Sequence, residues 1–171
     1  FQTVRYSEKI LQKAGITVVP VDLSDIFAAA NGIDHSAAKF KNQVAAIREY
    51  GTIPASISDE QVSRQAKFSI AINEWMQENE CVASAIQCWT SMQENYGCAS
   101  CLTMSMMGER KMPSACEVDV TGAVSMYALL LAADTPPGFL DWNNNYGAEP
   151  DKCVNTHCSN FPKSFLDCTP E

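Results

Sequence analysis

The stretch PSACEVDVTGAVSMYALLLA (residues 113–132) places the carboxylates of Glu117 and Asp119 directly before an almost unbroken apolar run. Two roles fit Glu117. Ser114 and Glu117 have the S-x-x-E spacing of a capping box, in which the serine hydroxyl and the glutamate each accept a hydrogen bond from a backbone N–H at the start of a helix. Alternatively, the carboxylate forms the floor of a metal site, because hard divalent cations prefer oxygen ligands. Taken alone, these residues favour the capping box.

Asp141 and His157 are the next candidates. Asp141 follows the apolar segment 136–140 and precedes Trp-Asn-Asn-Asn, which fits a strand that delivers polar groups at its carboxyl end, where open α/β sheets bind ligands. A solvated turn fits the same residues equally well, since Asp and Asn favour turns. His157 lies in VNTHCSN, and a loop histidine is more often a surface residue than a ligand. The other histidine, His35, has no partner pattern and carries little weight.

Eight cysteines suggest two further kinds of site. Cys98-x-x-Cys101 has zinc-ligand spacing and Cys153-x4-Cys158 comes close to it, so a structural zinc site is one interpretation. A disulfide scaffold is disfavoured because the chain is long and apolar enough to form a core without cross-links. The first cysteine pair also runs directly into an apolar segment, and free cysteine is a common small core residue. We therefore expect reduced thiols in a cytoplasmic protein.

The length of 171 residues predicts one domain, or one domain plus a piece of another, and the chain is expected to be globular because 46% of the residues are hydrophobic and 19% are charged. The net charge is −8 and no cluster of Lys and Arg appears, which argues against nucleic acid or an anionic membrane as a partner. The longest apolar run, 123–133, is about half of the roughly 20 residues that a membrane span needs. We expect no signal peptide before the fold, and the start at Phe1 is typical of the middle of a longer protein.

Helices and strands must position these residues. Helical spacing of apolar side chains predicts helices at 4–14, 23–32, 36–50, 58–80 and 118–133. Short apolar runs predict buried strands at 16–22, 81–89 and 101–107, with a further strand ending at Asp141. This alternation predicts an α/β fold, a three-layer domain with a mainly parallel sheet flanked by helices.

Four motifs carry a family resemblance: QCWTSM, CLTMSMMGERKMPSACEVDVTGAVSMYALLLA, GFLDWNN and NTHCSNFP. Together they resemble the L-fucose isomerase and L-arabinose isomerase superfamily, most of all the shorter fucose-isomerase-related sugar isomerases. The resemblance is strong over about residues 81–161 and looser through VPVDLSDIF and the 58–80 helix. The run PSACEVDVTGA is its specific part.

The resemblance implies an aldose–ketose isomerase that acts on a pentose or a 6-deoxyhexose through a metal-bound enediolate, with carboxylates moving the proton. Glu117 matches the first metal-binding carboxylate of the family, and Asp141 matches the second, 24 residues later (141 − 117). His157 corresponds to a histidine ligand of the arabinose isomerase branch. The implied ion is Mn²⁺ or another divalent metal, the implied partner is a small sugar, and the implied assembly is a homo-oligomer, a trimer or a hexamer.

The resemblance also implies a fragment of a larger multi-domain enzyme. Residues 1–30 would be the end of an N-terminal α/β domain or a connecting segment, and residues 31–171 the middle domain, with the C-terminal domain absent. The isolated fragment is then expected to be nearly inactive. Two alternatives stay open: a catalytically silent sugar-binding relative, and a small zinc-stabilised interaction domain. With the resemblance included, a catalytic role for Glu117 is favoured over the capping box.

Overall fold

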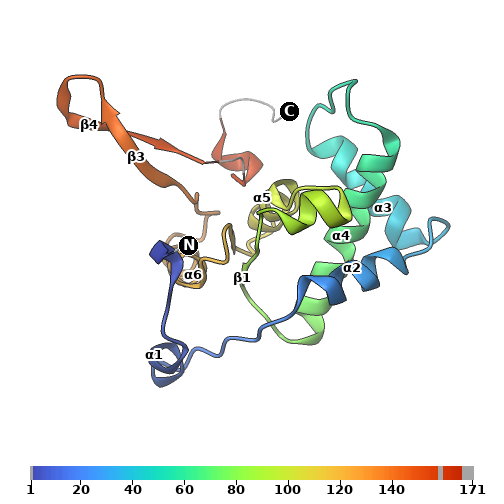
Figure 1. The fold of residues 1–171 in the computed structure, drawn as a ribbon, viewed down its shortest axis with the longest axis horizontal. Coiled ribbons are helices and arrows are strands. Elements are labelled where there is room, and N and C mark those ends of the chain that lie inside the picture. Colours follow the sequence, from blue (N-terminus) through green and yellow to red (C-terminus); the bar gives the residue numbers. More distant parts are fainter. Residues whose placement is uncertain (1, 158–159, 167–171) are drawn as a thin grey trace.

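The computed structural model describes residues 2–157 and 160–166, and about half of the chain is helical. A helical body forms around α4 (Asp59–Glu78), against which α2 (Leu23–Asn31) and α3 (Ala38–Tyr50) pack. Figure 1 shows these helices together at one end of the molecule, while a hairpin projects from the opposite end. The helices predicted at 23–32 and 36–50 are thereby confirmed.

The helix predicted at 58–80 is α4, and its start is set by local chemistry. Ser58 forms a capping box with Gln61, in which Gln61 N donates to Ser58 Oγ at 3.3 Å and Ser58 N donates to Gln61 Oε1 at 2.8 Å. One face of the helix is buried against its neighbours, and the side chains of Phe68 and Met76 are fully enclosed. α4 is therefore the central element of the main core.

The run CLTMSMM, predicted as a strand, is helix α5 (Cys101–Glu109), so that prediction is wrong. Its methionines at 104, 106 and 107 are all buried, because the helix is enclosed on more than one side. Thr103 joins α5 to α4 by accepting a hydrogen bond from Gln65 Nε2 at 2.7 Å and by contacting Ser69 Oγ at 2.5 Å. A helix buried in this way has an unbroken apolar run, which is also the pattern of a buried strand.

A small parallel sheet consists of β1 (Ser84–Ala85) and β2 (Ser114–Ala115). The ladder continues one residue further, where Ile86 N donates to Ala115 O at 2.9 Å. Because side chains alternate across a strand, Ala115 packs toward α6 (Val120–Ala133) while Cys116 packs into the main core. Helices therefore cover both faces of the sheet, and the predicted α/β class is confirmed. Within the described residues no helix, α6 included, is long and apolar enough to cross a membrane.

The N-terminal segment differs from its prediction. The helix predicted at 4–14 is two pieces, η1 (Gln2–Val4), which packs beside α6, and α1 (Glu8–Lys13). Residues 16–22 are not a strand, since the β-branched run has no ladder partner among the described residues. In Figure 1 this segment runs as an extended connection from α1 to α2.

The strand predicted to end at Asp141 is also wrong, because Asp141 is the first residue of a strand. β3 (Asp141–Tyr146) pairs antiparallel with β4 (Glu149–Thr156) through a turn that contains Gly147 at φ 57°. Every residue of β4 is exposed, and the hairpin projects from the body in Figure 1. After the hairpin, η3 (Lys163–Phe165) returns to the body, where Lys163 N donates to Tyr50 Oη at 2.9 Å.

Candidate functional site

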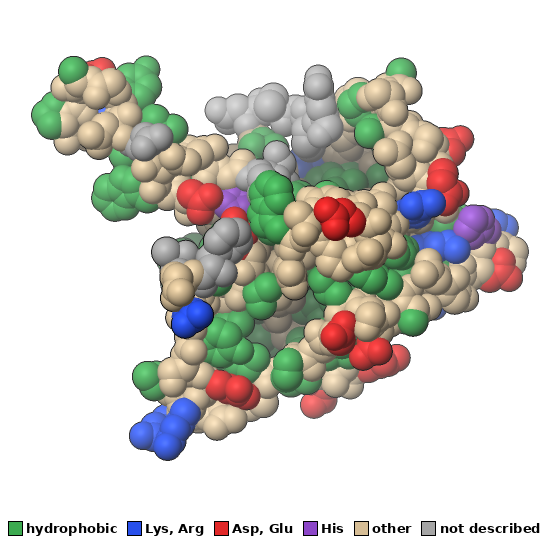
Figure 2. Space-filling model, in the orientation of Figure 1, with side chains coloured by type: hydrophobic (Ala, Val, Ile, Leu, Met, Phe, Trp, Pro, Cys, Tyr) green, Lys and Arg blue, Asp and Glu red, His purple; other side chains and the backbone are tan. Residues whose placement is uncertain are grey.

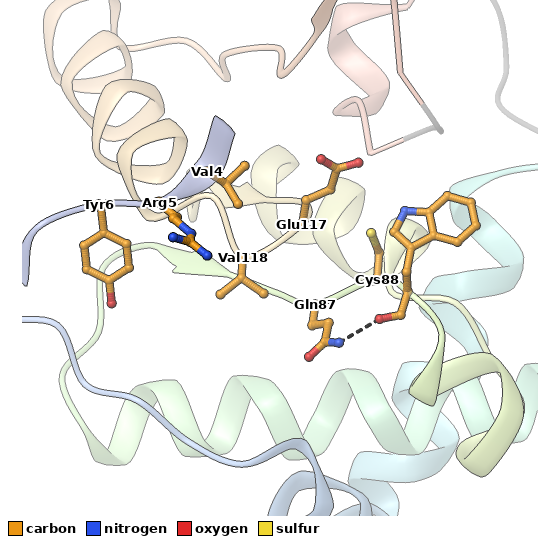
Figure 3. A pocket seen from close by; sticks show the side chains of 8 residues that line it. Val4, Arg5, Tyr6, Gln87, Cys88, Glu117 and Val118 are labelled. Atoms are coloured by element: carbon orange, nitrogen blue, oxygen red, sulfur yellow. Dashed lines mark hydrogen bonds between the residues drawn. The ribbon is translucent and has the colours of Figure 1, made fainter. Parts of the chain in front are cut away.

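An open pocket of about 510 Å³ lies at the carboxyl ends of the two parallel strands. The segment after β1 contributes residues 87–89, the segment after β2 contributes Glu117 and Val118, and the N-terminal segment contributes residues 4–6. Figure 3 shows these three segments meeting around the pocket. The carboxyl edge of a parallel sheet is where open α/β folds bind their ligands.

Glu117 is presented by a left-handed turn. Glu117 and Val118 have φ values of 61° and 59°, a conformation that non-glycine residues rarely adopt and that is especially unfavourable for a β-branched residue. The turn is held by backbone hydrogen bonds: Val118 N donates to Ile86 O at 3.3 Å, and Asp119 N donates to Cys116 O at 3.0 Å. Such strain costs roughly 1–3 kcal/mol per residue and is concentrated at functional sites. The turn therefore marks Glu117 as a functional candidate.

The capping box predicted for Ser114 and Glu117 is wrong. Asp119 is the N-cap of α6, and its Oδ1 accepts hydrogen bonds from Gly122 N at 2.7 Å and from Thr121 Oγ1 at 2.9 Å. Ser114 is instead in β2, where its hydroxyl contacts Ser84 Oγ at 2.7 Å. Within the described residues the Glu117 carboxylate forms no hydrogen bond or ion pair, so it is available to a ligand.

Asp141 and His157 meet at the base of the β3–β4 hairpin. Asp141 pairs with Thr156 in the ladder, and His157 is the next residue along the chain. Asp141 is exposed, whereas His157 is half-buried with its ring edge-on to Phe139 at a centroid distance of 5.2 Å. The Nδ1 atom of His157 is buried, and none of the residues that the structure describes forms a hydrogen bond with it. In Figure 2, a histidine and acidic side chains lie next to each other where the hairpin joins the body.

Phe139 links His157 to the start of α6. A Cβ atom added at Gly122 would lie 2.5 Å from Phe139 Cε2, which shows how closely the ring covers the first turn of this helix. Phe139 also packs against Ala115 and Ala123. The hairpin base is therefore anchored at the helix end that immediately follows Glu117.

The donor atoms of the three predicted metal ligands are suitable for a divalent ion, but the three side chains are not all gathered around one point. Two carboxylates and an imidazole nitrogen without a partner are suitable donors for Mn²⁺. However, among residues 2–157 and 160–166 no three His, Cys, Asp or Glu side chains lie close enough to hold one ion. Asp141 and His157 both lie at the base of the hairpin, where Asp141 pairs with the residue before His157, and Glu117 lines the pocket. A complete coordination shell is not formed by these side chains.

The zinc interpretation of the cysteines gains no support from the described part of the chain. Burial raises the pKa of the Cys98 thiol to about 12, which opposes the thiolate form that binds zinc. Cys153 is an exposed thiol on the projecting hairpin. Cys158, the fourth predicted ligand, lies outside the described residues. In the structure the thiols of Cys81, Cys88, Cys98 and Cys153 are free.

A second pocket, of about 370 Å³, lies between α3, α4 and the segment before α5. Its lining is largely apolar and includes Ile53, Leu102 and the half-buried Cys98, with no Asp, Glu or His among the residues described there. Since acid–base chemistry and metal binding need such groups, the pocket at the sheet edge is the better candidate for a catalytic site.

Four polar or aromatic side chains of the sheet-edge pocket were missed by the residue-level analysis: Arg5, Tyr6, Gln87 and Trp89. Arg5 comes from a segment far from Glu117 in sequence, and no local pattern connects the two. Gln87 and Trp89 lie in QCWTSM, which only the family resemblance had singled out; Gln87 Nε2 donates to Trp89 O at 2.7 Å. Pairing of β1 with β2 is what brings them beside Glu117.

No protein-family model matches the chain. The sulfoquinovose isomerase of Alkalicoccus urumqiensis is 34% identical over 145 residues, which are 84% of this chain and 32% of that protein. The sulfoquinovose isomerases of Priestia aryabhattai and Priestia megaterium are each 27% identical over 158 residues, 92% of this chain and 35% of theirs. The chain thus spans about one third of the length of the curated relatives that it matches. These similarities support a sugar isomerase family and do not single out its fucose isomerase branch.

Proposed function

We propose that the full-length protein is an aldose–ketose isomerase and that the sheet-edge pocket is part of its active site. The observation that carries this proposal is the Glu117 carboxylate, which a strained left-handed turn presents at the carboxyl edge of β1 and β2 and which has no hydrogen-bond or ion-pair partner in the described part of the chain. The similarity to proteins named sulfoquinovose isomerase supports the same reaction class.

The reaction needs a group that moves one proton between neighbouring carbons. A base removes the proton from C2 of the open-chain aldose, the C2–H electrons form the enediolate, and the proton is returned to C1 while a hydroxyl proton moves from O2 to O1. No atom is gained or lost. We assign this proton transfer to the carboxylates of Glu117 and Asp141. General acid–base catalysis of this kind contributes roughly 10²–10⁴-fold in rate.

A divalent cation such as Mn²⁺ would supply Lewis acidity, which polarises the sugar carbonyl and stabilises the negative charge of the enediolate. We propose Glu117, Asp141 and His157 as the ligands that this chain contributes. The orphaned Nδ1 of His157 is the supporting observation, since a buried imidazole nitrogen without a partner is costly unless a ligand satisfies it. The remaining ligands would come from residues beyond those described.

The substrate is proposed to be a pentose or a 6-deoxyhexose. The 6-deoxyhexose meant here is of the L-fucose type and the pentose of the L-arabinose type, and the names of the relatives add sulfoquinovose as a further candidate outside these two types. A homo-oligomer, a trimer or a hexamer, is part of the same proposal. The competing possibility is a silent relative that binds sugars without converting them.

The test is an aldose–ketose assay on the full-length protein with added Mn²⁺, using L-fucose, L-arabinose, 6-deoxyglucose and sulfoquinovose. Glu117→Gln is run beside Glu78→Gln, a control at the exposed end of α4. Binding of Mn²⁺ is followed separately by electron paramagnetic resonance. Turnover that is lost only in Glu117→Gln supports the proposal. Folded protein that binds Mn²⁺ and converts none of the sugars would overturn it in favour of the silent relative.

A further inference from the structure

We propose that Trp89 is a substrate-binding residue of the sheet-edge pocket and that its indole stacks against the C–H face of the sugar. This inference rests on the proposed isomerase function and adds a residue that determines affinity and specificity. A sugar carries hydroxyl groups at its edges, while the C–H groups on its faces form a less polar surface. The neighbouring oxygen atoms leave these C–H groups with partial positive charge, so they are attracted to the negative face of an aromatic ring.

The first argument is the place of Trp89 in the pocket that contains Glu117. Its side chain is 51% exposed, and single exposed apolar side chains are common on protein surfaces, so the exposure matters because of where it occurs. Trp89 and the Glu117 carboxylate line the same pocket of about 510 Å³, a volume within the range of small-molecule sites. The other two tryptophans lie elsewhere: Trp75 packs against the main core, and Trp142 is on the projecting hairpin.

The second argument is that the backbone at Trp89 is held in place while the indole is left available. The side chains of Cys88 and Met92, on either side of it in the chain, are both buried. Gln87 Nε2 donates to Trp89 O at 2.7 Å, which is the hydrogen bond drawn in Figure 3. The indole itself forms no hydrogen bond, ring stacking or cation–π contact with the residues that the structure describes. An aromatic surface that is already fixed in this way loses little conformational entropy when a ligand binds.

The third argument is the mixed character of the pocket. Besides the indole, its lining includes Arg5, Gln87 and Glu117, whose side chains can form hydrogen bonds with hydroxyl groups. Figure 3 shows these three side chains distributed around the pocket. A wholly apolar ligand would leave these polar groups without partners, and a ligand without an apolar face would leave the indole uncovered. A sugar satisfies both parts of the lining, because its edges are polar and its faces are not.

The experiment compares Trp89→Leu and Trp89→Phe in the full-length protein. Leucine keeps an apolar side chain but removes the aromatic face, whereas phenylalanine keeps that face. Tyr146→Leu is the matched control, because this aromatic side chain is 54% exposed at the end of β3 and lies outside the pocket. Turnover is measured with L-fucose, L-arabinose, 6-deoxyglucose and sulfoquinovose. Binding is measured independently by calorimetry with the 1,5-anhydro analogues of these sugars, which lack the anomeric oxygen and therefore cannot open or isomerise.

A spectroscopic measurement separates direct contact from a structural effect. In protein labelled with 5-fluorotryptophan, the fluorine resonance of Trp89 is the one that is missing from Trp89→Phe. We expect this resonance to shift when an analogue binds. The urea unfolding midpoint of Trp89→Leu should match that of the unmodified protein, because a half-exposed side chain contributes little to stability.

We expect Trp89→Leu to raise KM for the sugar and Kd for its analogue about 10-fold, with little change in kcat, because the stacking contact is made equally in the ground state and the transition state. Trp89→Phe should recover most of the loss. If Trp89→Leu alters KM and Kd no more than Tyr146→Leu does, or if a bound analogue leaves the fluorine resonance unchanged, the stacking role is refuted while the isomerase function stands. Absence of turnover on every sugar refutes the isomerase function, and selective loss of analogue binding in Trp89→Leu would still show the stacking role. Absence of both turnover and analogue binding refutes both.

Discussion

Asp119 caps a helix, whereas Glu117, two residues earlier, is the proposed catalytic group. Substituting each residue in turn tests the two roles separately. Asp119 Oδ1 accepts hydrogen bonds from Gly122 N at 2.7 Å and from Thr121 Oγ1 at 2.9 Å, so Asp119→Ala removes the N-cap of α6. Loss of such a cap costs about 1 kcal/mol, with a range of roughly 0.5–2. This corresponds to an about 5-fold larger population of the open first turn. Asp119→Asn retains the acceptor and should change little.

Glu117→Gln should behave in the opposite way. The carboxylate has no hydrogen-bond or ion-pair partner among the described residues, so its replacement should change stability by less than about 0.5 kcal/mol. Turnover should nevertheless fall by about 10²-fold or more, because the proton-transfer group is lost. Asp119→Ala should lower turnover less, through a looser turn at Glu117.

The assay is hydrogen exchange by mass spectrometry on the full-length protein, read on peptides that cover the first turn of α6, alongside turnover measurements. Faster exchange in Asp119→Ala with unchanged exchange in Glu117→Gln is the expected pattern. If Glu117→Gln accelerates exchange in this turn as much as Asp119→Ala, Glu117 supports the helix, and the argument that its carboxylate is reserved for a ligand fails.

Three further predictions concern the body of the protein. Phe68→Ala should lower the free energy of unfolding by about 3–5 kcal/mol, measured in urea, since the ring is fully buried; a loss below about 1 kcal/mol would contradict its place in the core. Gly122→Ala should displace Phe139, because the new Cβ would lie 2.5 Å from the ring. We expect the free energy of unfolding to fall by about 1–3 kcal/mol and Mn²⁺ binding, measured by calorimetry, to weaken. Unchanged stability would show that the ring is not in this position. Cys98 should resist iodoacetamide at pH 8 while Cys153 reacts, because burial raises the pKa of Cys98 to about 12 from an ordinary 9.0. The unfolded thiol ionises first, so stability should fall as pH rises from about 9 toward 12.

The long helices could be predicted from sequence because their signals are local. The helix at 58–80 carries its own capping box at Ser58 and Gln61 and a consistent apolar face, and it forms α4 as expected. The α/β class was predicted correctly, although of the four predicted strands only the run at 81–89 contains a strand of the parallel sheet, β1. By contrast, an apolar run without periodicity does not distinguish a buried helix from a buried strand, which explains the error at α5.

The candidate site was predictable only in part. Glu117, Asp141 and His157 were chosen from motifs, and their roles as ligands and proton carriers stay predictions. The capping error at Ser114 has a clear cause: pairing with Ser84 placed Ser114 in β2, so the helix began later, at Asp119. A capping motif depends only on residues that are close in sequence. Here the pairing of Ser114 with Ser84, 30 residues earlier in the chain, excluded the local capping interaction.

The sequence by itself determined the long helices, the α/β class and the acidic character of the chain, because each depends on local periodicity or on composition. The tertiary structure decided which segments meet at the edge of the sheet. Parallel pairing of β1 with β2 places Gln87 and Trp89 beside Glu117, and the packing of η1 against α6 adds Arg5. The left-handed turn at Glu117 and Val118 likewise depends on the hydrogen bond to Ile86 O. These contacts join residues far apart in the chain, and no local pattern encodes them.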